Sequence, residues 1–427
     1  MHSHDPESRG RRQFLQAGGA GLALTLAGCA TTPTGPKARV AVVGGGFGGA
    51  TAAKYVRMLD PAIEVTMIEP NSEFISCPLS NLVIGGFATM PVITMKYEGM
   101  VQRHGVKWVR DSATAIDMEK KEVRLSKGGS VAFDRVIVAP GVDFMWEALP
   151  GMGTVDAQNY ILHAWKAGAQ TLGLRRQLEA MADGGVFAMA IPEAPYRCPP
   201  GPYERACQVA AYFKAHKRKS KVLVLDANGD VTSKGALFKK AWAELYPGLI
   251  EYRPNSKAVD VDWRTATVKL EFGDVKADVL NVIPPQKAGN VAAPFITANK
   301  RWCEVDWLTY ESKAVKGAHV LGDSLQIAPL MPKSATMANA HGKTCAAAVV
   351  ALLNGERPNP APSLINTCYS MVSDKMAIHV ASVHKYDEKD HTMKTVPGSG
   401  GLSPAMNETE AAYNMNWAKN IWADALG

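Results

Sequence analysis

Two cysteines lie in segments that suit redox chemistry. Cys198 lies in the stretch PEAPYRCPPGP, and Cys368 lies in NTCYS, after a linker rich in proline. A cysteine pair beside an electron acceptor can oxidise a nucleophilic substrate, because the substrate opens the disulfide and the freed thiolate passes on an electron pair. The sequence leaves this pairing open, because it requires a fold that brings two distant segments together.

The other cysteines of the mature chain divide into one further candidate and three structural residues. Cys77 lies in SCPLS, just past the first predicted strand–helix–strand unit. Cys207 and Cys345 stand in alanine-rich helical contexts and are expected to be small buried residues. Cys303 is also expected to be structural.

A glycine-rich turn near the start of the chain predicts a dinucleotide site. A short apolar strand over residues 38–43 runs into GGGFGG, and a helix is expected over residues 50–59. The pattern G-x-G-x-x-G is formed by Gly44, Gly46 and Gly49. These glycines allow a tight turn, an approach of backbone N–H groups to a pyrophosphate, and close packing of helix on strand. A second strand over residues 64–68 ends at Glu69, where a carboxylate would bond a ribose hydroxyl.

The place of this unit at the start of the mature chain favours FAD over NAD. The strand FDRVIVAPG is like the strand that crosses back toward FAD in flavoproteins with two dinucleotide units. A later strand, HVLGD, ends at Asp323, which would accept a hydrogen bond from the ribityl chain or serve only as a turn residue. A helix expected over residues 334–350 would point its positive N-terminus at the flavin and stabilise the reduced anion.

A second strand–helix–strand unit follows over residues 185–226, but its turn is unsuited to phosphate. The turn over residues 192–202 holds five prolines and one glycine. Proline lacks the N–H group that would cradle a phosphate. We therefore expect no NAD(P) site, although Asp226 at the end of the second strand would by itself suggest one. The electron donor is then a small molecule that reaches the flavin directly.

Composition and charge exclude several classes of protein. The 427 residues are 47% hydrophobic and 20% charged, which excludes a disordered chain and a coiled coil. The net charge of +7 is too small and too dispersed to indicate nucleic acid, although it suits an acidic partner. No apolar run reaches about 18 residues, so no spanning helix is expected. The chain has no C-x-x-C-H motif, so we expect no covalent haem on it, and no metal site is expected.

Residues 1–30 have the pattern of an export signal. Arg11 and Arg12 precede QFL and a weakly apolar stretch, which is typical of the twin-arginine route for folded, cofactor-loaded proteins. The expected location is therefore the periplasm. The segment LAGC resembles a lipobox, so Cys29 either carries a lipid anchor or is removed with the signal.

The predicted fold class is α/β, with two Rossmann-like dinucleotide-binding domains of the disulfide-reductase type and a small C-terminal domain. The FAD-binding domain is assigned to residues 38–150 and 275–352, the degenerate second domain to 151–274, and the C-terminal domain to 353–427. This last domain carries the aromatic residues Tyr413, Trp417 and Trp422. We expect them to form the core of an amphipathic helix, the alternative being a surface that faces the flavin or a partner.

Several motifs together resemble the flavoprotein subunit of flavocytochrome c sulfide dehydrogenase. They are GGGFGGATAAKYVR, ISCPLSNLVIGG, YRCPPGPYERA, NVIPPQKAGN, HVLGD and INTCYS, and they span nearly all of residues 38–427. Many flavoproteins share the glycine motif, whereas RCPPGPYERA together with INTCYS is much more specific. The resemblance implies FAD, a periplasmic location, a c-type cytochrome subunit as partner, and oxidation of sulfide to sulfur or polysulfide.

The resemblance also implies roles for individual residues. The family's redox disulfide joins the cysteines that match Cys198 and Cys368. Its flavin is linked through the 8α-methyl carbon to a cysteine that matches Cys77, although Pro78 stands here where an aromatic residue is expected. A free Cys77 beside non-covalent FAD is the alternative. Glu204 matches a glutamate placed over the flavin as a candidate base, the alternative being a helix-start residue that meets the helix dipole.

Two other functions stay open. A sulfide:quinone oxidoreductase would need an apolar membrane-binding surface, and residues 405–427 are only moderately amphipathic. An exported electron-relay flavoprotein without its own sulfide site is the second alternative. The proline-rich turn disfavours a third, an NADH-dependent reductase.

Overall fold

The computed structural model describes residues 35–297 and 299–427. The predicted export signal over residues 1–30, with Arg11, Arg12 and Cys29, lies outside the described residues. Residues Ala38–Gly427 form one unit, which carries every other residue singled out above.

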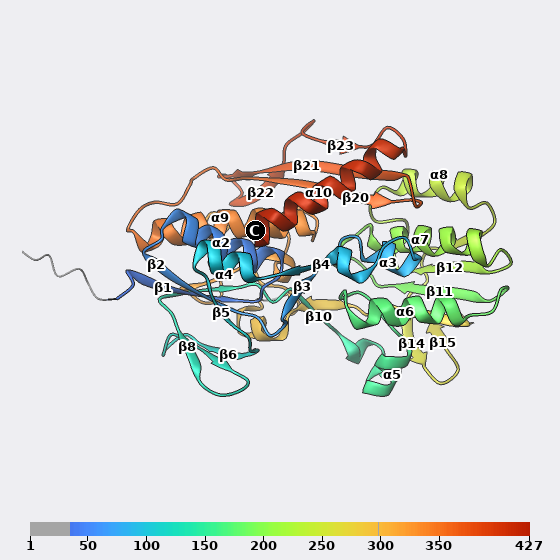
Figure 1. Ribbon diagram of the computed structural model, residues 1–427, viewed down its shortest axis with the longest axis horizontal. Helices are drawn as coiled ribbons and strands as arrows, with labels where there is room; N and C mark the ends of the chain where they lie inside the picture. The colour runs from blue at the N-terminus through green and yellow to red at the C-terminus, as the bar shows by residue number, and fades with distance from the viewer. Residues whose placement is uncertain (1–34, 298) are drawn as a thin grey trace, which may run out of the picture. The chain divides into compact units, whose positions relative to one another are not determined.

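The first sheet positions the glycine-rich turn. It has parallel strands in the order β19-β9-β1-β2-β5. These strands are β1 (Ala38–Val43), β2 (Ile63–Ile68), β5 (Lys107–Val109), β9 (Arg135–Val138) and β19 (Ala318–Val320). Helix α2 (Phe47–Leu59) follows β1 and packs against α9 (Ala335–Leu353), on the left of Figure 1. Strand β1 is buried along nearly its whole length, as expected inside a parallel sheet.

The geometry of the turn requires two of its glycines. Gly44 has a φ of +98°, and a Cβ there would lie 2.4 Å from the Ala139 carbonyl oxygen. A Cβ on Gly49 would lie 1.9 Å from the Gly44 carbonyl oxygen, so α2 could not approach the turn so closely. The helix begins at Phe47, earlier than the expected residue 50, because Gly46 is its N-cap residue.

The second sheet carries the proline-rich turn. Its parallel strands, in the order β13-β12-β11-β17, are β11 (Val186–Ile191), β12 (Lys221–Asp226), β13 (Ile250–Arg253) and β17 (Val279–Val282). Helix α7 (Gly201–His216) connects β11 to β12, and α6 (Ala169–Ala180) and α8 (Gly235–Leu245) lie nearby in Figure 1. Because β17 pairs with β11, residues 279–282 belong to this sheet, whereas the sequence had placed 275–352 with the FAD-binding domain.

The C-terminal segment reaches across both dinucleotide units. Its strands are β20 (Ser363–Met371), β21 (Ala377–Asp387), β22 (Thr392–Thr395) and β23 (Gly401–Leu402), followed by helix α10 (Glu408–Leu426). Strand β20 contacts both α9 and α7, and α10 packs on α2, β20 and β21 (Figure 1). The segment therefore places the residues of β20 between the two units.

The three aromatic residues of α10 have different environments. Trp422 is buried, as a helix core requires, and Trp417 is partly buried. Tyr413 is 53% exposed, so the expectation that all three form a core is wrong for this residue. Trp417 contacts the Tyr369 ring of β20, with centroids 6.4 Å apart, and it also lines the main cavity, as the alternative for these aromatic residues expected.

Shorter elements complete the unit. The strands are β3 (Glu73–Ile75), β4 (Thr94–Lys96), β6 (Ala113–Asp117), β7 (Glu122–Leu125), β8 (Ser130–Ala132), β10 (Val142–Phe144), β14 (Ala258–Asp262), β15 (Thr267–Leu270), β16 (Gly273–Lys276) and β18 (Gln286–Ala288). The helices are α3 (Ser80–Gly85), α4 (Glu98–His104) and α5 (Val155–Tyr160). The 3₁₀ turns are η1 (Met90–Ile93), η2 (Trp146–Ala148), η3 (Pro150–Met152), η4 (Asn290–Phe295) and η5 (Gly322–Ser324).

The two parallel sheets, each built around a strand–helix–strand unit, confirm the predicted α/β class. Within residues 35–297 and 299–427, no helix combines the length and the apolar character that a membrane crossing requires. The division into three domains at the expected boundaries stays a prediction, apart from the placement of β17.

Candidate active site

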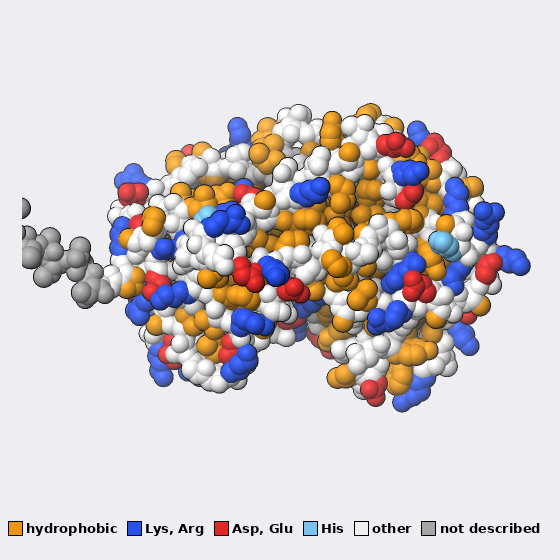
Figure 2. Space-filling model, in the orientation of Figure 1, with side chains coloured by type: hydrophobic (Ala, Val, Ile, Leu, Met, Phe, Trp, Pro, Cys, Tyr) orange, Lys and Arg blue, Asp and Glu red, His pale blue; other side chains and the backbone are white. Residues whose placement is uncertain are grey.

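One cavity brings the predicted residues together. Its volume is about 430 Å³, and it extends from the glycine-rich turn to the C-terminal sheet. The predicted residues that line it are Gly44, Gly46, Glu69, Cys77, Cys198, Glu204, Asp323 and Cys368. Gly49 does not line the cavity, and its role is the close packing of α2 described above. Figure 2 shows a hollow lined largely by hydrophobic side chains between the positions of α10 and α3.

Glu69 holds the glycine-rich turn in place. Its Oε2 accepts a hydrogen bond from the Gly45 backbone N–H at 2.8 Å. Its Oε1 accepts two from Asn71, one from the backbone at 2.9 Å and one from Nδ2 at 2.6 Å. The carboxylate also lines the cavity, so the predicted bond to a ribose hydroxyl would add to a structural role that the sequence did not indicate.

Asp323 supplies the strongest structural indication of a bound polar ligand. It lies in the η5 turn just past β19, and its Oδ1 is buried without a hydrogen-bond partner among the described residues. A buried oxygen without a donor costs about 1–3 kcal/mol. A ribityl hydroxyl would supply that donor. The glycine-rich turn also leaves room for a ligand, because a Cβ on Gly46 would meet no atom within 4 Å. The residues present therefore fit FAD.

Cys77 lies in the cavity wall beside Arg197 of the proline-rich turn. The Ala167 backbone N–H donates to Cys77 Sγ at 3.5 Å, and the Ser80 hydroxyl donates to the Cys77 carbonyl at 2.7 Å. Burial lowers the pKa of Arg197, but its neighbours, Cys77 foremost, raise it by more. The Cys77 sulfur therefore lies in the cavity wall next to a buried guanidinium.

Cys198 is held at the tip of the proline-rich turn. Its φ is +54°, a left-handed value that is uncommon outside glycine, and its backbone N–H donates to the Lys333 carbonyl at 2.7 Å. Burial raises the pKa of its thiol, and neighbouring Cys368 and Glu204 raise this pKa further. A free thiol here is therefore a poor nucleophile, whereas a sulfur in a disulfide needs no ionisation to be attacked.

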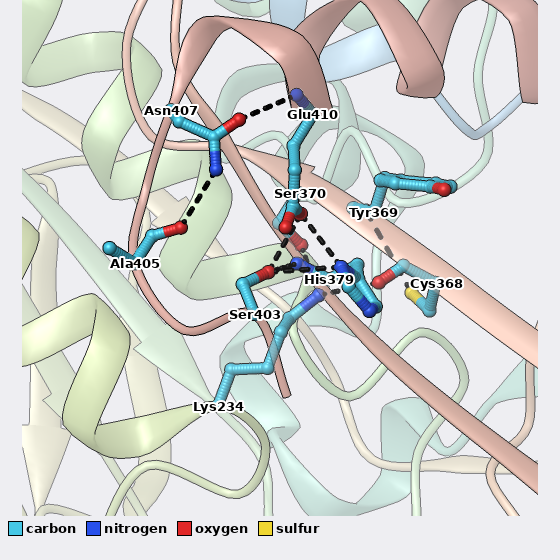
Figure 3. Close-up of polar contacts among 9 residues, drawn as sticks. All are labelled: Lys234, Cys368, Tyr369, Ser370, His379, Ser403, Ala405, Asn407 and Glu410. Atoms are coloured by element: carbon cyan, nitrogen blue, oxygen red, sulfur yellow. Dashed lines mark hydrogen bonds and ion pairs between the residues drawn. The ribbon is translucent and has the colours of Figure 1, made fainter. Parts of the chain in front are cut away.

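Cys368 reaches the same place from strand β20. Its carbonyl accepts a hydrogen bond from Lys234 Nζ at 2.9 Å, as Figure 3 shows. Burial raises the pKa of its thiol, and Lys234 opposes that rise. The structure thus brings Cys198 and Cys368 to one cavity. Cys207, Cys303 and Cys345 are buried as predicted.

Glu204 lies in the first turn of α7 and faces the same cavity. The Asn81 side-chain amide donates to Oε2 at 2.8 Å, and the Met371 backbone N–H donates to Oε1 at 2.8 Å. Burial raises the pKa of this carboxyl, and the two hydrogen bonds limit the rise. Glu204 thus fits both interpretations. It lies in the first turn of a helix, and its carboxyl group, whose pKa is raised, lines the cavity that contains the two cysteines.

The sequence analysis missed Arg205, which is 1% exposed and lines the cavity. Its guanidinium donates to the Asn81 side chain at 3.1 Å and to the Asn281 side chain at 2.9 Å. It also donates to the backbone carbonyls of His163 and Ala164, at 2.8 and 2.6 Å. Burial lowers the pKa of Arg205 to about 10. The only available signal was its place beside Glu204 in PYER.

A second missed cation, Lys333, lies under the η5 turn. It is 2% exposed, and its Nζ donates to the carbonyls of Asp323, at 2.9 Å, and of Leu325. The ammonium lies 3.6 Å from the centroid of the Trp302 ring. Burial lowers the pKa of Lys333 to about 7. Because its own carbonyl binds the Cys198 N–H, Lys333 connects the turn of Asp323 to the cysteine loop.

The acid that would mark an NAD site faces the interior of the second unit. Asp226 is fully buried, and its Oδ2 accepts from the hydroxyls of Tyr203, at 2.7 Å, and Tyr252, at 3.0 Å. Its Oδ1 accepts two hydrogen bonds from Asn228. A carboxylate with four internal donors is a structural residue and has little capacity left for a ribose.

Comparison with known proteins agrees with this geometry. Residues 38–177 match the family model of pyridine nucleotide-disulphide oxidoreductases. Residues 171–284 match the central domain of the sulfide dehydrogenase [flavocytochrome c] flavoprotein chain, and residues 360–426 match the flavin-binding domain of flavocytochrome c sulphide dehydrogenase. The fold and site thus define a flavoprotein of the disulfide-oxidoreductase class.

The relatives specify the family within that class. The chain is 64% identical to a sulfide dehydrogenase [flavocytochrome c] flavoprotein chain of Chlorobaculum thiosulfatiphilum over 45 residues, which are 10% of this chain and 94% of that one. The chain belongs to this family of flavocytochrome c sulfide dehydrogenase flavoprotein chains.

More distant relatives share the fold. The mitochondrial sulfide:quinone oxidoreductase of Mus musculus is 23% identical over 307 residues, 66% of this chain and 65% of that protein. The solved sulfide:quinone oxidoreductase of Aquifex aeolicus superposes with a TM-score of 0.75 at 16% identity, covering 91% of each chain. A NAD-dependent persulfide reductase from A. fulgidus superposes with a TM-score of 0.62 at 14% identity, covering 90% of this chain and 77% of that one.

Proposed function

We propose that this chain oxidises sulfide to sulfur or polysulfide with FAD, through a disulfide between Cys198 and Cys368. The observation that carries the proposal is the convergence of both cysteines on the cavity that also contains the glycine-rich turn and Asp323. Family membership supplies the substrate class. FAD, when bound, supplies an acceptor that takes an electron pair and releases electrons singly.

The chain's own residues perform the sulfur chemistry. Hydrosulfide attacks one sulfur of the disulfide, so the S–S bond breaks and a new S–S bond forms between substrate and cysteine. The other cysteine leaves as a thiolate with the electron pair of the broken bond. The substrate proton is lost from the resulting persulfide, and we assign Glu204 to take it, because this cavity carboxylate acts on the pKa of Cys198.

We infer that NAD(P)H is not the electron donor. The proline-rich turn offers few N–H donors, and the side chain of Asp226 is taken up by Tyr203, Tyr252 and Asn228. The second dinucleotide unit then serves to present Cys198 and Glu204, which lie on either side of the start of α7.

The proposed electron acceptor is a c-type cytochrome subunit, because the name of the family includes one and this sequence carries no C-x-x-C-H motif. The likeness to sulfide:quinone oxidoreductases makes a quinone the second candidate. We expect purified, FAD-loaded protein to pass electrons from sulfide to a soluble c-type cytochrome much faster than to a short-chain quinone in detergent. Faster reduction of the quinone would show that a quinone, and not a cytochrome, is the electron acceptor.

We further propose that Cys77 is bonded to the 8α carbon of the flavin. Serine at this position cannot form a thioether, so Cys77→Ser should release its flavin into the supernatant when the protein is precipitated with acid. The wild-type pellet should stay yellow and give a Cys77 peptide that carries the mass of the flavin. A wild-type protein that releases all its flavin would show instead that FAD is held without a covalent bond.

Glu204 should contribute a pH-dependent step. Its pKa is raised, so the basic carboxylate form appears only as the pH rises above the ordinary range for glutamate. Glu204→Gln should slow sulfide oxidation about a hundredfold and remove this rising part of the pH profile. The control is Glu179→Gln, which alters an exposed carboxylate paired with Arg175. An unchanged profile in Glu204→Gln would assign Glu204 to helix formation alone.

We propose export to the periplasm by the twin-arginine route, from Arg11 and Arg12. Replacing both with lysine should leave the protein in the cytoplasmic fraction. Metabolic labelling with a fatty acid would test the lipid anchor on Cys29, since label is expected only if the lipobox is used. Equal export of the lysine variant would contradict the assigned route.

A further inference from the structure

Lys234 is a buried cation that reaches the cysteine site from another part of the fold. It is the N-cap residue of α8, has a φ of +58°, and is 4% exposed. Its Nζ donates to the Cys368 carbonyl at 2.9 Å and to the Ser370 hydroxyl at 2.8 Å, both on strand β20 (Figure 3). A side chain from the second dinucleotide unit thus binds the strand that carries Cys368.

This ammonium has no carboxylate partner of its own among the ion pairs of the described residues. Burying a lysine without an ion pair is costly, because the charge loses its water. The anions within its electrostatic reach are those of the cysteine site, since its charge lowers the pKa of Cys198, Cys368 and Glu204. Lys234 therefore faces groups that become negative during sulfide oxidation.

A second cluster of polar side chains, on β21 and α10, lies next to strand β20. The Glu410 carboxylate accepts a hydrogen bond from the Ser403 hydroxyl at 2.7 Å and lies 2.8 Å from His379 Nδ1 (Figure 3). His379 is the register partner of Tyr369, the residue after Cys368. This cluster holds α10 to β21, so the C-terminal sheet is fixed by contacts that do not involve Lys234. What Lys234 adds at the cysteine site is therefore mainly its positive charge.

We propose that Lys234 is a positioning residue of the cysteine pair, whose ammonium orients Cys368 through its carbonyl and stabilises the thiolate set free when the disulfide opens. This inference rests on the proposed function. The thiolate carries the electron pair of the broken S–S bond, and Lys234 neither gains nor loses a proton in the step. The other charged groups at the site are Glu204 on α7, which opposes this effect, and Arg197 on the proline-rich turn and Arg205 on α7, which support it.

The test measures thiol reactivity in the FAD-loaded protein after chemical reduction. Alkylation of Cys198 and Cys368 is followed against pH by peptide mass spectrometry in wild type, Lys234→Met and Lys234→Arg. An opposite charge nearby shifts a pKa by about one unit or more, so we expect Lys234→Met to slow alkylation of the faster thiol about tenfold near pH 8. Lys234→Arg keeps the charge and should retain most of the rate.

A matched control separates charge from fold. Lys217 is also buried, with its Nζ on the carbonyls of Glu179 and Met181, and its charge is not among those that act on Cys198 or Cys368. Lys217→Met should leave both pH profiles unchanged. A Lys234→Met profile equal to that of wild type would overturn the inference, as would Lys234→Arg behaving like Lys234→Met in a protein that still binds FAD.

The same samples separate this inference from the proposed function. Peptide maps of unreduced wild type should contain Cys198 linked to Cys368. If that link is absent, the proposed disulfide fails whatever the lysine variants do. If the link is present and the alkylation profiles do not move, only the role of Lys234 fails.

Discussion

Replacing Cys198 with serine will slow the reduction of bound FAD by sulfide by about a thousandfold or more, with FAD still bound. A serine hydroxyl cannot form the disulfide that hydrosulfide attacks, and Cys368 alone has a thiol whose pKa is raised by burial. Cys198 is fixed through its backbone, to Lys333 and to Gly201, so the loop should keep its conformation in the variant. Rapid mixing with sulfide without oxygen, followed by flavin absorbance, measures the effect.

The matched control is Cys207→Ser, on the helix that follows the loop. Cys207 is buried and accepts a hydrogen bond from Trp242 Nε1, which a serine oxygen can also accept. This variant should reduce its flavin at nearly the wild-type rate. A Cys198→Ser protein whose flavin was still reduced by sulfide at the wild-type rate would contradict the disulfide as the entry point for electrons.

Replacing Arg205 with methionine will lower the free energy of unfolding by about 3–5 kcal/mol. The change removes a buried guanidinium and leaves the side-chain oxygens of Asn81 and Asn281 and the Ala164 carbonyl without this donor. Glu204 loses a nearby positive charge as well, so the pKa of its carboxyl should rise further. Denaturant unfolding of the FAD-loaded protein measures the loss.

Arg218→Met is the control for this second prediction. Arg218 is exposed in the turn just after α7, so its replacement should change the unfolding free energy by no more than about 0.5 kcal/mol. If Arg205→Met cost less than about 1 kcal/mol, the buried network around Asn81 would contribute little to stability, and Arg205 would be free to serve another role.

The local parts of the site could be predicted from the sequence. The glycine-rich turn, its flanking strands and the HVLGD strand depend on short-range patterns, and the structure has β1, α2, β2 and β19 at those places. The unsuitability of the second turn for phosphate also follows from composition, because each proline removes a donor regardless of the surrounding fold. Helix starts differed from the prediction by a few residues, since glycine, proline and serine caps decide them.

The convergence of the site could not be predicted in this way. Cys198 precedes α7 and Cys368 lies on β20, and only the packing of β20 across α7 brings them to one cavity. The resemblance implied the pair, whereas the spacing of the cysteines carried no such information. The placement of β17 in the second sheet likewise depends on a strand pairing that its own four residues, three of them apolar, do not specify.

The buried cations are the clearest omission. Arg205, Lys234 and Lys333 stand in the sequence as ordinary charged residues, and such residues are usually exposed. Their acceptors are carbonyls and amides from distant segments, so no local pattern marks them. The positive charge around the cysteines and Asp323 is therefore a property of the tertiary structure.

The most direct test of the central claim is the addition of sulfide, without oxygen, to the purified FAD-loaded protein, with NADH added to a parallel sample. The account predicts rapid loss of the oxidised flavin absorbance with sulfide and no change with NADH. Bleaching by NADH alone would contradict it, because the second dinucleotide unit would then be a working nucleotide site and the cysteine pair would not be the entry point for electrons.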